Sequence, residues 1–140
     1  MYYPITLSPE LALTITQTLK LPRDSQILDI TAFGDIFIQT GPTVTLYSFT
    51  DGTISDVSDL IEEFGLPPVN LDLGDQWYQV SAQAMLHEKQ YILNSDECFC
   101  FKQALYNEGV YGPENIIVIK ILDYYAQRLQ QLTRTTHQHQ

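Results

Sequence analysis

Three aspartates in the first half of the chain are the residues whose type best suits a divalent cation. Asp29 lies within a β-like run, whereas Asp35 and Asp51 stand at turns. Carboxylate oxygens are the hard ligands that magnesium and calcium prefer. Aspartate is also favoured at turns, because its side chain hydrogen-bonds to the nearby backbone. This local role suffices for two of the three, so we expect neither a metal site nor any other cofactor.

Cys98 and His87 are the residues that could form a nucleophile and its base. A reactive thiolate needs electropositive surroundings, and the acidic neighbours Asp96 and Glu97 disfavour one. The zinc-peptidase signature His-Glu-x-x-His begins at His87 but ends in Tyr91, so its second metal ligand is missing. The chain also contains no Gly-x-Ser-x-Gly, P-loop or Gly-x-Gly-x-x-Gly sequence. We therefore expect no enzymatic activity.

The soft ligands of the chain are too few for a structural zinc site. Cys98 and Cys100 are the only cysteines, whereas such a site takes four ligands. Two residues apart in a strand, their side chains share a face and rarely form a disulfide. His137 and His139 lie in a polar terminal segment and are expected to be inert. Reduced thiols, no apolar run of about 20 residues and no leader-like start predict a cytoplasmic protein.

Acidic residues dominate the charge of the 140-residue chain. It contains 17 Asp and Glu against 7 Lys and Arg, and no Lys or Arg lies between Arg23 and Lys89. This balance disfavours direct binding to nucleic acid, because phosphate contacts need clustered Lys and Arg. A basic partner protein is the complementary interpretation. Surface acidity can also serve solubility alone.

Two sets of residues are candidates for a binding site. The densest acidic cluster is hypothesised to face a basic partner and consists of Asp56, Asp59, Glu62 and Glu63. Under the second hypothesis the protein is a ligand-binding or regulatory domain, with an aromatic pocket formed by Trp77, Tyr78 and Phe101. A lone tryptophan is more often a core anchor than a ligand contact, so Trp77 also has a purely structural explanation.

A β meander is the element that must position these residues. Alternating, β-branched segments between turn formers predict strands at 27–32, 36–40, 44–49 and 53–55. Asp51-Gly52 predicts a two-residue hairpin turn in which both residues adopt positive φ. A further alternating segment at 96–102 predicts a late strand that completes the sheet. Its two cysteines would lie on one face, with Phe99 and Phe101 on the other.

Helices are predicted on both sides of the meander. Ser8-Pro9-Glu10 has the composition of a helix start, and Pro22 ends that helix. After the meander, Asp59 and Glu62 resemble a capping box. They predict a short helix at 59–64.

Two apolar stripes at helical spacing predict helices in the second half of the chain. They are Trp77, Val80, Ala84 and His87 for a helix over 75–90, and Leu122, Tyr125, Leu129 and Leu132 for a helix from about residue 120. Residues 116–120 fit a strand and a helix equally well. No repeat or linker divides the chain, so we expect one α+β domain over 1–140. It would comprise a short helical segment at 1–26, a core at 27–132 and a flexible tail at 133–140.

Five short segments, taken in order, resemble a family of bacterial proteins. They are residues 32–38 (AFGDIFI), 45–53 (TLYSFTDGT), 59–64 (DLIEEF), 97–101 (ECFCF) and 114–115 (EN). Together they resemble the C-terminal domain of the Tdi-type immunity proteins, also called the GAD-related family. The chain departs from the family pattern at Cys100, where glycine is common. Gly109 and Gly112 are separated where the family often has a pair.

The resemblance implies an immunity protein, which is an antitoxin that protects the cell producing it. Members of the family bind a DNase effector delivered by type VI secretion. A DNase must be basic to hold DNA, and an acidic immunity protein can compete for that surface. On this resemblance, the partner is a basic toxin, and residues 27–132 form the immunity-like core.

Overall fold

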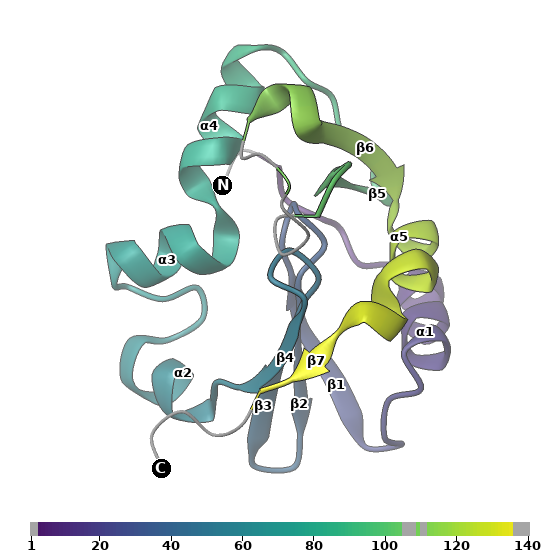
Figure 1. Ribbon diagram of the computed structural model, residues 1–140. Coiled ribbons are helices and arrows are strands. Elements are labelled where there is room, and N and C mark those ends of the chain that lie inside the picture. The colour runs from purple at the N-terminus through teal and green to yellow at the C-terminus, as the bar shows by residue number, and fades with distance from the viewer. Residues whose placement is uncertain (1–2, 105–108, 110–111, 136–140) are drawn as a thin grey trace.

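A five-stranded sheet lies at the centre of the computed structural model, which describes residues 3–104, 109 and 112–135 (Figure 1). In spatial order its strands are β1 (Ser25–Ile30), β2 (Ile36–Thr40), β3 (Thr43–Ser48), β4 (Thr53–Asp56) and β7 (Thr133–Arg134). The first four form the antiparallel meander that the alternating sequence predicts. The first residues of the expected flexible tail instead pair in parallel with β4. There, Thr133 N–H donates to the Gly52 carbonyl at 2.9 Å.

The connection between β3 and β4 is a four-residue loop rather than the predicted two-residue turn. Ser48 pairs with Thr53, which leaves residues 49–52 outside the ladder. Only Gly52 among them adopts positive φ, at +74°. The Ser48 hydroxyl oxygen accepts from Asp51 N–H at 3.1 Å. The side chain therefore satisfies the loop backbone, and the longer loop needs only one residue with positive φ.

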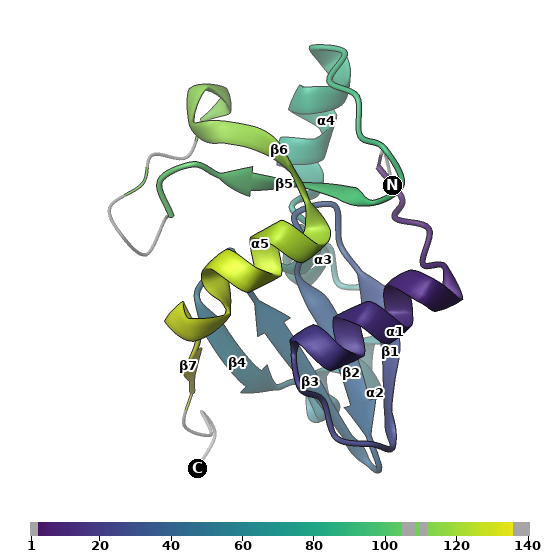
Figure 2. The same ribbon diagram turned by 90° about the vertical axis from the view of Figure 1, so that its right-hand side faces the viewer.

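Helices cover both faces of this sheet, as Figures 1 and 2 show. The helices are α1 (Pro9–Thr18) and α5 (Ile121–Arg128) on one face, and α2 (Ser58–Phe64) and α3 (Leu71–Tyr78) on the other. Each face of the sheet therefore has its own core: the first core lies beneath α1 and α5, and the second beneath α2 and α3. Because side chains alternate along a strand, Ile36 and Ile38 enter the first core while Phe37 enters the second. All three are at most 1% exposed. The predicted α+β fold is confirmed.

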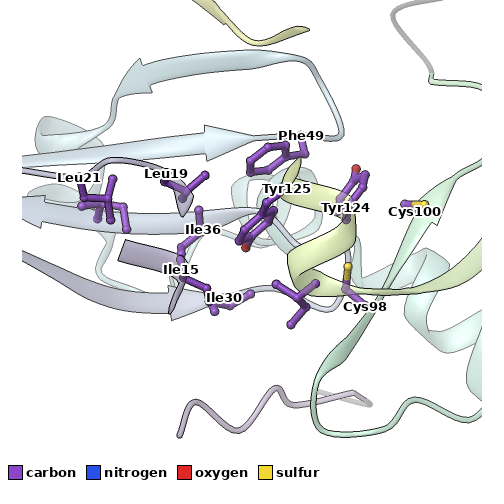
Figure 3. Packing of buried hydrophobic residues seen from close by; sticks show 12 residues of the cluster. Ile15, Leu19, Leu21, Ile30, Ile36, Phe49, Cys98, Cys100, Tyr124 and Tyr125 are labelled. Atoms are coloured by element: carbon purple, nitrogen blue, oxygen red, sulfur yellow. The ribbon is translucent and has the colours of Figure 1, made fainter. Parts of the chain in front are cut away.

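Aromatic side chains of α5 fill the first core (Figure 3). Tyr125 stacks on Phe49 with ring centroids 4.5 Å apart, and its hydroxyl donates to the Gly34 carbonyl at 2.7 Å. The ring of Tyr124 lies 5.5 Å from that of Phe49. The apolar stripe that predicts this helix includes Tyr125 but misses Tyr124 and Ile121, which are buried to the same degree.

The start of α1 follows the sequence prediction, but that of α2 does not. Ser8 caps α1, with its hydroxyl oxygen 3.1 Å from a first-turn N–H. The predicted capping box of α2 is wrong, because Val57 and not Asp59 stands at the cap position and makes no side-chain bond there. Asp56 satisfies the helix start instead. Its carboxylate accepts from the backbone N–H and the hydroxyl of Ser58, at 2.9 and 2.6 Å.

The single helix predicted over 75–90 is two helices, α3 and α4 (Val80–Glu88). Gln79 separates them and adopts left-handed dihedrals, with φ 53° and ψ 52°. Helix α3 also begins earlier than predicted, because the Asn70 side chain caps its first turn. The predicted stripe is accordingly wrong: Trp77 is buried, whereas Val80 and His87 are exposed. The buried positions of α4 are Ala82, Gln83 and Leu86.

A second sheet consists of two antiparallel strands, β5 (Glu97–Phe101) and β6 (Ile116–Lys120). The prediction that the late strand completes the meander is therefore wrong, and the ambiguous residues 116–120 form a strand. Cys98 and Cys100 enter the first core, while Phe99 and Phe101 pack in a third cluster with α4. The predicted division of this strand into two faces is confirmed.

Two short 3-10 helices, η2 (Pro113–Asn115) and η3 (Leu129–Gln131), precede β6 and follow α5. The third cluster lies where α4 meets the second sheet, and Figure 2 shows this sheet beyond the end of the meander. Within the described residues, no helix has the length and apolar character that crossing a membrane requires.

Candidate functional site

A groove of about 430 Å³ lies between the strands β3 and β4 and the helices α2 and α3. Its acidic lining consists of Asp51, Asp56 and Asp59. Its apolar lining consists of Leu46, Val57, Leu60, Leu73 and Trp77. Grooves of this size and mixed lining are typical of binding sites. The structure therefore places carboxylates and an aromatic side chain around one recess.

The four acidic residues predicted to face a partner are all exposed, but only two line this groove. Asp56 and Asp59 do so, whereas Glu62 and Glu63 lie on α2 and are not part of its lining. Asp51 lines the groove and was missed, because the sequence offers a turn as its explanation. Its position within the long segment without Lys or Arg is the signal that could have identified it.

Local structure fixes where the three carboxylates stand. Asp56 is held at the end of β4 by its two hydrogen bonds from Ser58. Asp51 lies in the β3–β4 loop, where its N–H is bonded to the Ser48 hydroxyl. Asp59 occupies the first turn of α2, where the helix dipole favours a negative charge. Such a set can bind a guanidinium or ammonium group through charge-assisted hydrogen bonds.

Trp77 belongs to the core and also lines the groove. It is 5% exposed, and its ring meets that of Phe37 edge-on, with centroids 5.1 Å apart. The structural explanation for this residue therefore holds. The aliphatic part of a lysine or arginine could pack along this apolar floor while its charged end reached the carboxylates.

The aromatic pocket predicted from Trp77, Tyr78 and Phe101 is not formed. Trp77 and Tyr78 both pack on Phe37 beneath α3, whereas Phe101 stacks on Phe33 in the cluster with α4. Sequence proximity could not reveal this separation, because β5 belongs to a different sheet. Burial, followed by the hydrogen bond to Asp29, raises the pKa of Tyr78 above its usual range.

A second hollow of about 490 Å³ lies on the opposite side of α3. Its lining includes Pro67, Pro68, Leu71, Tyr78 and Val80. Leu71 is 88% exposed and Val80 is 41% exposed, so apolar surface surrounds this hollow. Helix α3 thus separates an acidic groove from an apolar one.

A buried carboxylate lies behind the β3–β4 loop. Asp35 is 3% exposed and accepts from the backbone N–H and the hydroxyl of Thr50, at 3.1 and 3.2 Å, and from the Ser48 hydroxyl at 3.4 Å. The Gln79 amide donates to the Thr50 hydroxyl at 3.3 Å. Burial, with repulsion from Asp51 added, raises the pKa of Asp35 to about 7 despite the hydrogen bonds from Thr50.

The described residues considered for metal binding and nucleophilic chemistry are not assembled into a reactive site. Asp29 accepts the Tyr78 hydroxyl at 2.6 Å. Within the described ranges, no three His, Cys, Asp or Glu side chains are placed to hold a metal ion. Cys98 lies in the first core, where burial raises the pKa of its thiol well above the usual value, while His87 is exposed on α4. His137 and His139 lie outside the described residues.

No protein-family model and no curated protein matches this chain.

Proposed function

We propose that this protein is a non-enzymatic, antitoxin-like protein of the cytoplasm that binds and neutralises a basic toxin. The observation that carries the proposal is the acidic groove, where Asp51, Asp56 and Asp59 surround a recess floored by Trp77. The ligand-binding alternative has weaker support, because the three aromatic residues that motivated it lie in two separate clusters.

Charge complementarity supplies the mechanism. A nuclease that holds DNA presents Lys and Arg side chains to phosphates. The groove offers those side chains carboxylates in place of phosphates, so a bound antitoxin excludes the nucleic acid. The formal net charge of −10 also steers a basic partner toward the protein before contact. Such steering speeds association by roughly 10- to 1,000-fold at low salt.

Co-purification with the product of the adjacent reading frame is the direct test. We expect a stoichiometric complex whose dissociation constant rises with salt, because exposed charges are screened. We also expect the complex to lose any nuclease activity that the product has alone. If neither the adjacent product nor any other basic protein of the same cell binds, the proposal is wrong.

A pair of charge-matched variants tests whether the groove itself faces the partner. Replacing Asp51 and Asp59 together with asparagine should slow association and flatten its salt dependence. Replacing Glu62 and Glu63 together with glutamine removes the same charge from exposed positions outside the groove. Stopped-flow or surface-plasmon measurements should find the groove variant several-fold slower than this control. Equal rates would mean that only overall charge matters and that the contact lies elsewhere.

The apolar hollow beside α3 should contribute to the lifetime of the same complex. Apolar anchors determine dissociation more than charges do. Changing Leu71 to serine should speed dissociation by roughly 10- to 100-fold, because a leucine buried in the interface contributes about 1.5–3 kcal/mol. The control is Leu13→Ser, which alters a leucine of α1 that is 60% exposed on the other face of the sheet. If both variants dissociate at the wild-type rate, the hollow is not part of the interface.

A further inference from the structure

The indole N–H of Trp77 is a hydrogen-bond donor that the described part of the chain leaves unused. Among the described residues, the amide oxygen of Gln79 is the one fully buried side-chain polar atom without a partner. The indole nitrogen is therefore in contact with solvent, although Trp77 as a whole is only 5% exposed. Trp77 lines the acidic groove, so the groove is where a ligand can reach this donor. The N–H of a buried tryptophan usually finds a partner, and here a ligand can supply it.

The groove offers this donor on one wall and carboxylates on the others (Figure 1). Trp77 belongs to α3, whereas Asp51 and Asp56 come from the β3–β4 hairpin and Asp59 from α2. No lysine or arginine is among the described residues that line the groove. The acceptor that Trp77 serves has to be neutral, because a ligand carboxylate would be repelled by three negative charges. A ligand that matches all the walls therefore carries a cation and a carbonyl group.

An arginine residue within a peptide combines these two groups. Its guanidinium carries five N–H donors in a planar fork, which suits carboxylates that approach from different elements. Its peptide carbonyl is a neutral acceptor. Lysine has the same carbonyl, but its ammonium is a point charge with three donors and lacks the fork. The groove volume of about 430 Å³ lies near the lower end of the range of roughly 300–1,000 Å³ for small-ligand pockets, so it suits one residue rather than a folded element.

We infer that the groove is a pocket for a single arginine of the partner protein. Asp51, Asp56 and Asp59 bind the guanidinium, and the Trp77 N–H donates to a peptide carbonyl at the same arginine. The inference rests on the proposed function for the source of the arginine, because a basic toxin supplies it. Arginine is among the residues that dominate binding energy when they fill a central pocket, so one arginine of the toxin should matter more than its neighbours.

Trp77 is the only tryptophan of the chain, so one indole N–H signal in a ¹H–¹⁵N NMR spectrum of the full protein reports on this groove. The probe is N-acetyl-arginine N-methylamide, which has a guanidinium, two peptide carbonyls and no charged terminus. It should shift the indole signal and reach saturation with a dissociation constant in the millimolar range. N-acetyl-alanine N-methylamide lacks the cation and should leave the signal in place. An indole signal that does not respond to the arginine probe, or responds equally to the alanine probe, overturns the inference.

Two further probes separate the parts of the ligand. Methylguanidinium has the cation without the carbonyl, so it should bind several-fold more weakly than the arginine probe and barely shift the indole signal. The lysine analogue of the probe should also bind several-fold more weakly, because it lacks the fork. If methylguanidinium shifts the indole signal as far as the arginine probe does, the carbonyl contact is wrong. If the lysine analogue binds equally well, the assignment to arginine is wrong.

Matched variants test where the cation binds. Asp59→Asn should weaken binding of the arginine probe several-fold, whereas Glu63→Gln removes the same charge from α2 outside the groove lining and should not. Equal binding by both variants overturns the pocket. The inference and the proposed function fail separately. If a basic toxin binds but the arginine probe does not, the pocket is wrong and the function stands; if the probe binds but no basic toxin does, the function is wrong and the pocket stands.

Discussion

Replacing Gly34 with alanine is expected to destabilise the protein by roughly 2–5 kcal/mol. Gly34 adopts φ +82°, a conformation that costs an alanine about 1–2 kcal/mol. An added Cβ would also stand 2.9 Å from a ring carbon of Tyr124 and 3.0 Å from the Cys98 sulfur. Overpacking of this kind costs about 1–3 kcal/mol. The two costs have different origins, so we expect them to combine.

The neighbours of Gly34 have little room to yield. Tyr124 is 1% exposed and Cys98 is completely buried. The Gly34 carbonyl accepts the Tyr125 hydroxyl at 2.7 Å, so a backbone shift that relieved the overlap would also weaken this buried hydrogen bond. Relief at one contact thus creates a cost at another.

Urea denaturation of two alanine variants separates backbone strain from overpacking. Gly41 also has positive φ, +59°, but no atom lies within 4 Å of the position its Cβ would take. Gly41→Ala should therefore lose only about 1–2 kcal/mol of unfolding free energy. If Gly34→Ala loses no more than this control, the core around Tyr124 is softer than the contacts indicate.

The local patterns that predict the fold correctly are those that need no distant partner. The β-branched and aromatic residues of 36–38 identify β2, and Ser8 marks the start of α1. The break at Gln79 had no such signal, because glutamine is an ordinary helix residue. Its left-handed conformation accompanies a distant contact, in which its amide donates to Thr50. Strand β7 likewise depends on the chain returning to β4.

The candidate site likewise contains residues that local sequence identifies and residues that only distant contacts bring together. Acid density in the sequence identifies Asp56 and Asp59, because residues close in the chain remain close in the fold. Asp51 stands in the loop before β4, whereas Asp56 ends that strand, and only the folded arrangement of the hairpin with α2 and α3 reveals that they line one groove. The hypothesised aromatic pocket joins residues that the fold keeps apart. Phe101 is far from Trp77 in sequence, and only the pairing of β5 with β6 reveals that they enter different clusters.

Asparagine in place of Asp35 is expected to stabilise the protein at pH 8 and to leave its stability at acidic pH nearly unchanged. In the folded protein, burial raises the pKa of this carboxyl from 3.8 to about 7. Between these values the native state holds a proton that the unfolded chain releases, so unfolding free energy falls as pH rises. The stabilisation is complete below about pH 4 and is lost as the pH passes about 7. The difference of about 3 pKa units corresponds to about 4 kcal/mol as an upper value.

Asparagine can reproduce the protonated carboxyl without losing its partners. Its amide oxygen can accept from Thr50 as Asp35 does, and its NH₂ can donate to the Ser48 hydroxyl oxygen, 3.4 Å from the present carboxylate. The groups that face this position from neighbouring elements are Asp51, Cys98, Tyr124 and Tyr125. Burial raises the pKa of the thiol and of both tyrosines above the usual values, so Asp51 is the charge that opposes ionisation at neutral pH.

Urea denaturation at about pH 3.5 and at pH 8 measures this effect as a difference between proteins, so that other titrating groups cancel. Asp35→Asn should match the wild type at about pH 3.5 and exceed it by about 2–4 kcal/mol at pH 8. Asp24→Asn, which removes the same charge from an exposed position, should show no such change with pH. A variant less stable than the wild type at both values would mean that ionised Asp35 and its hydrogen bonds stabilise the β3–β4 loop. In that case, desolvation would be the smaller of the two opposing effects at this carboxyl.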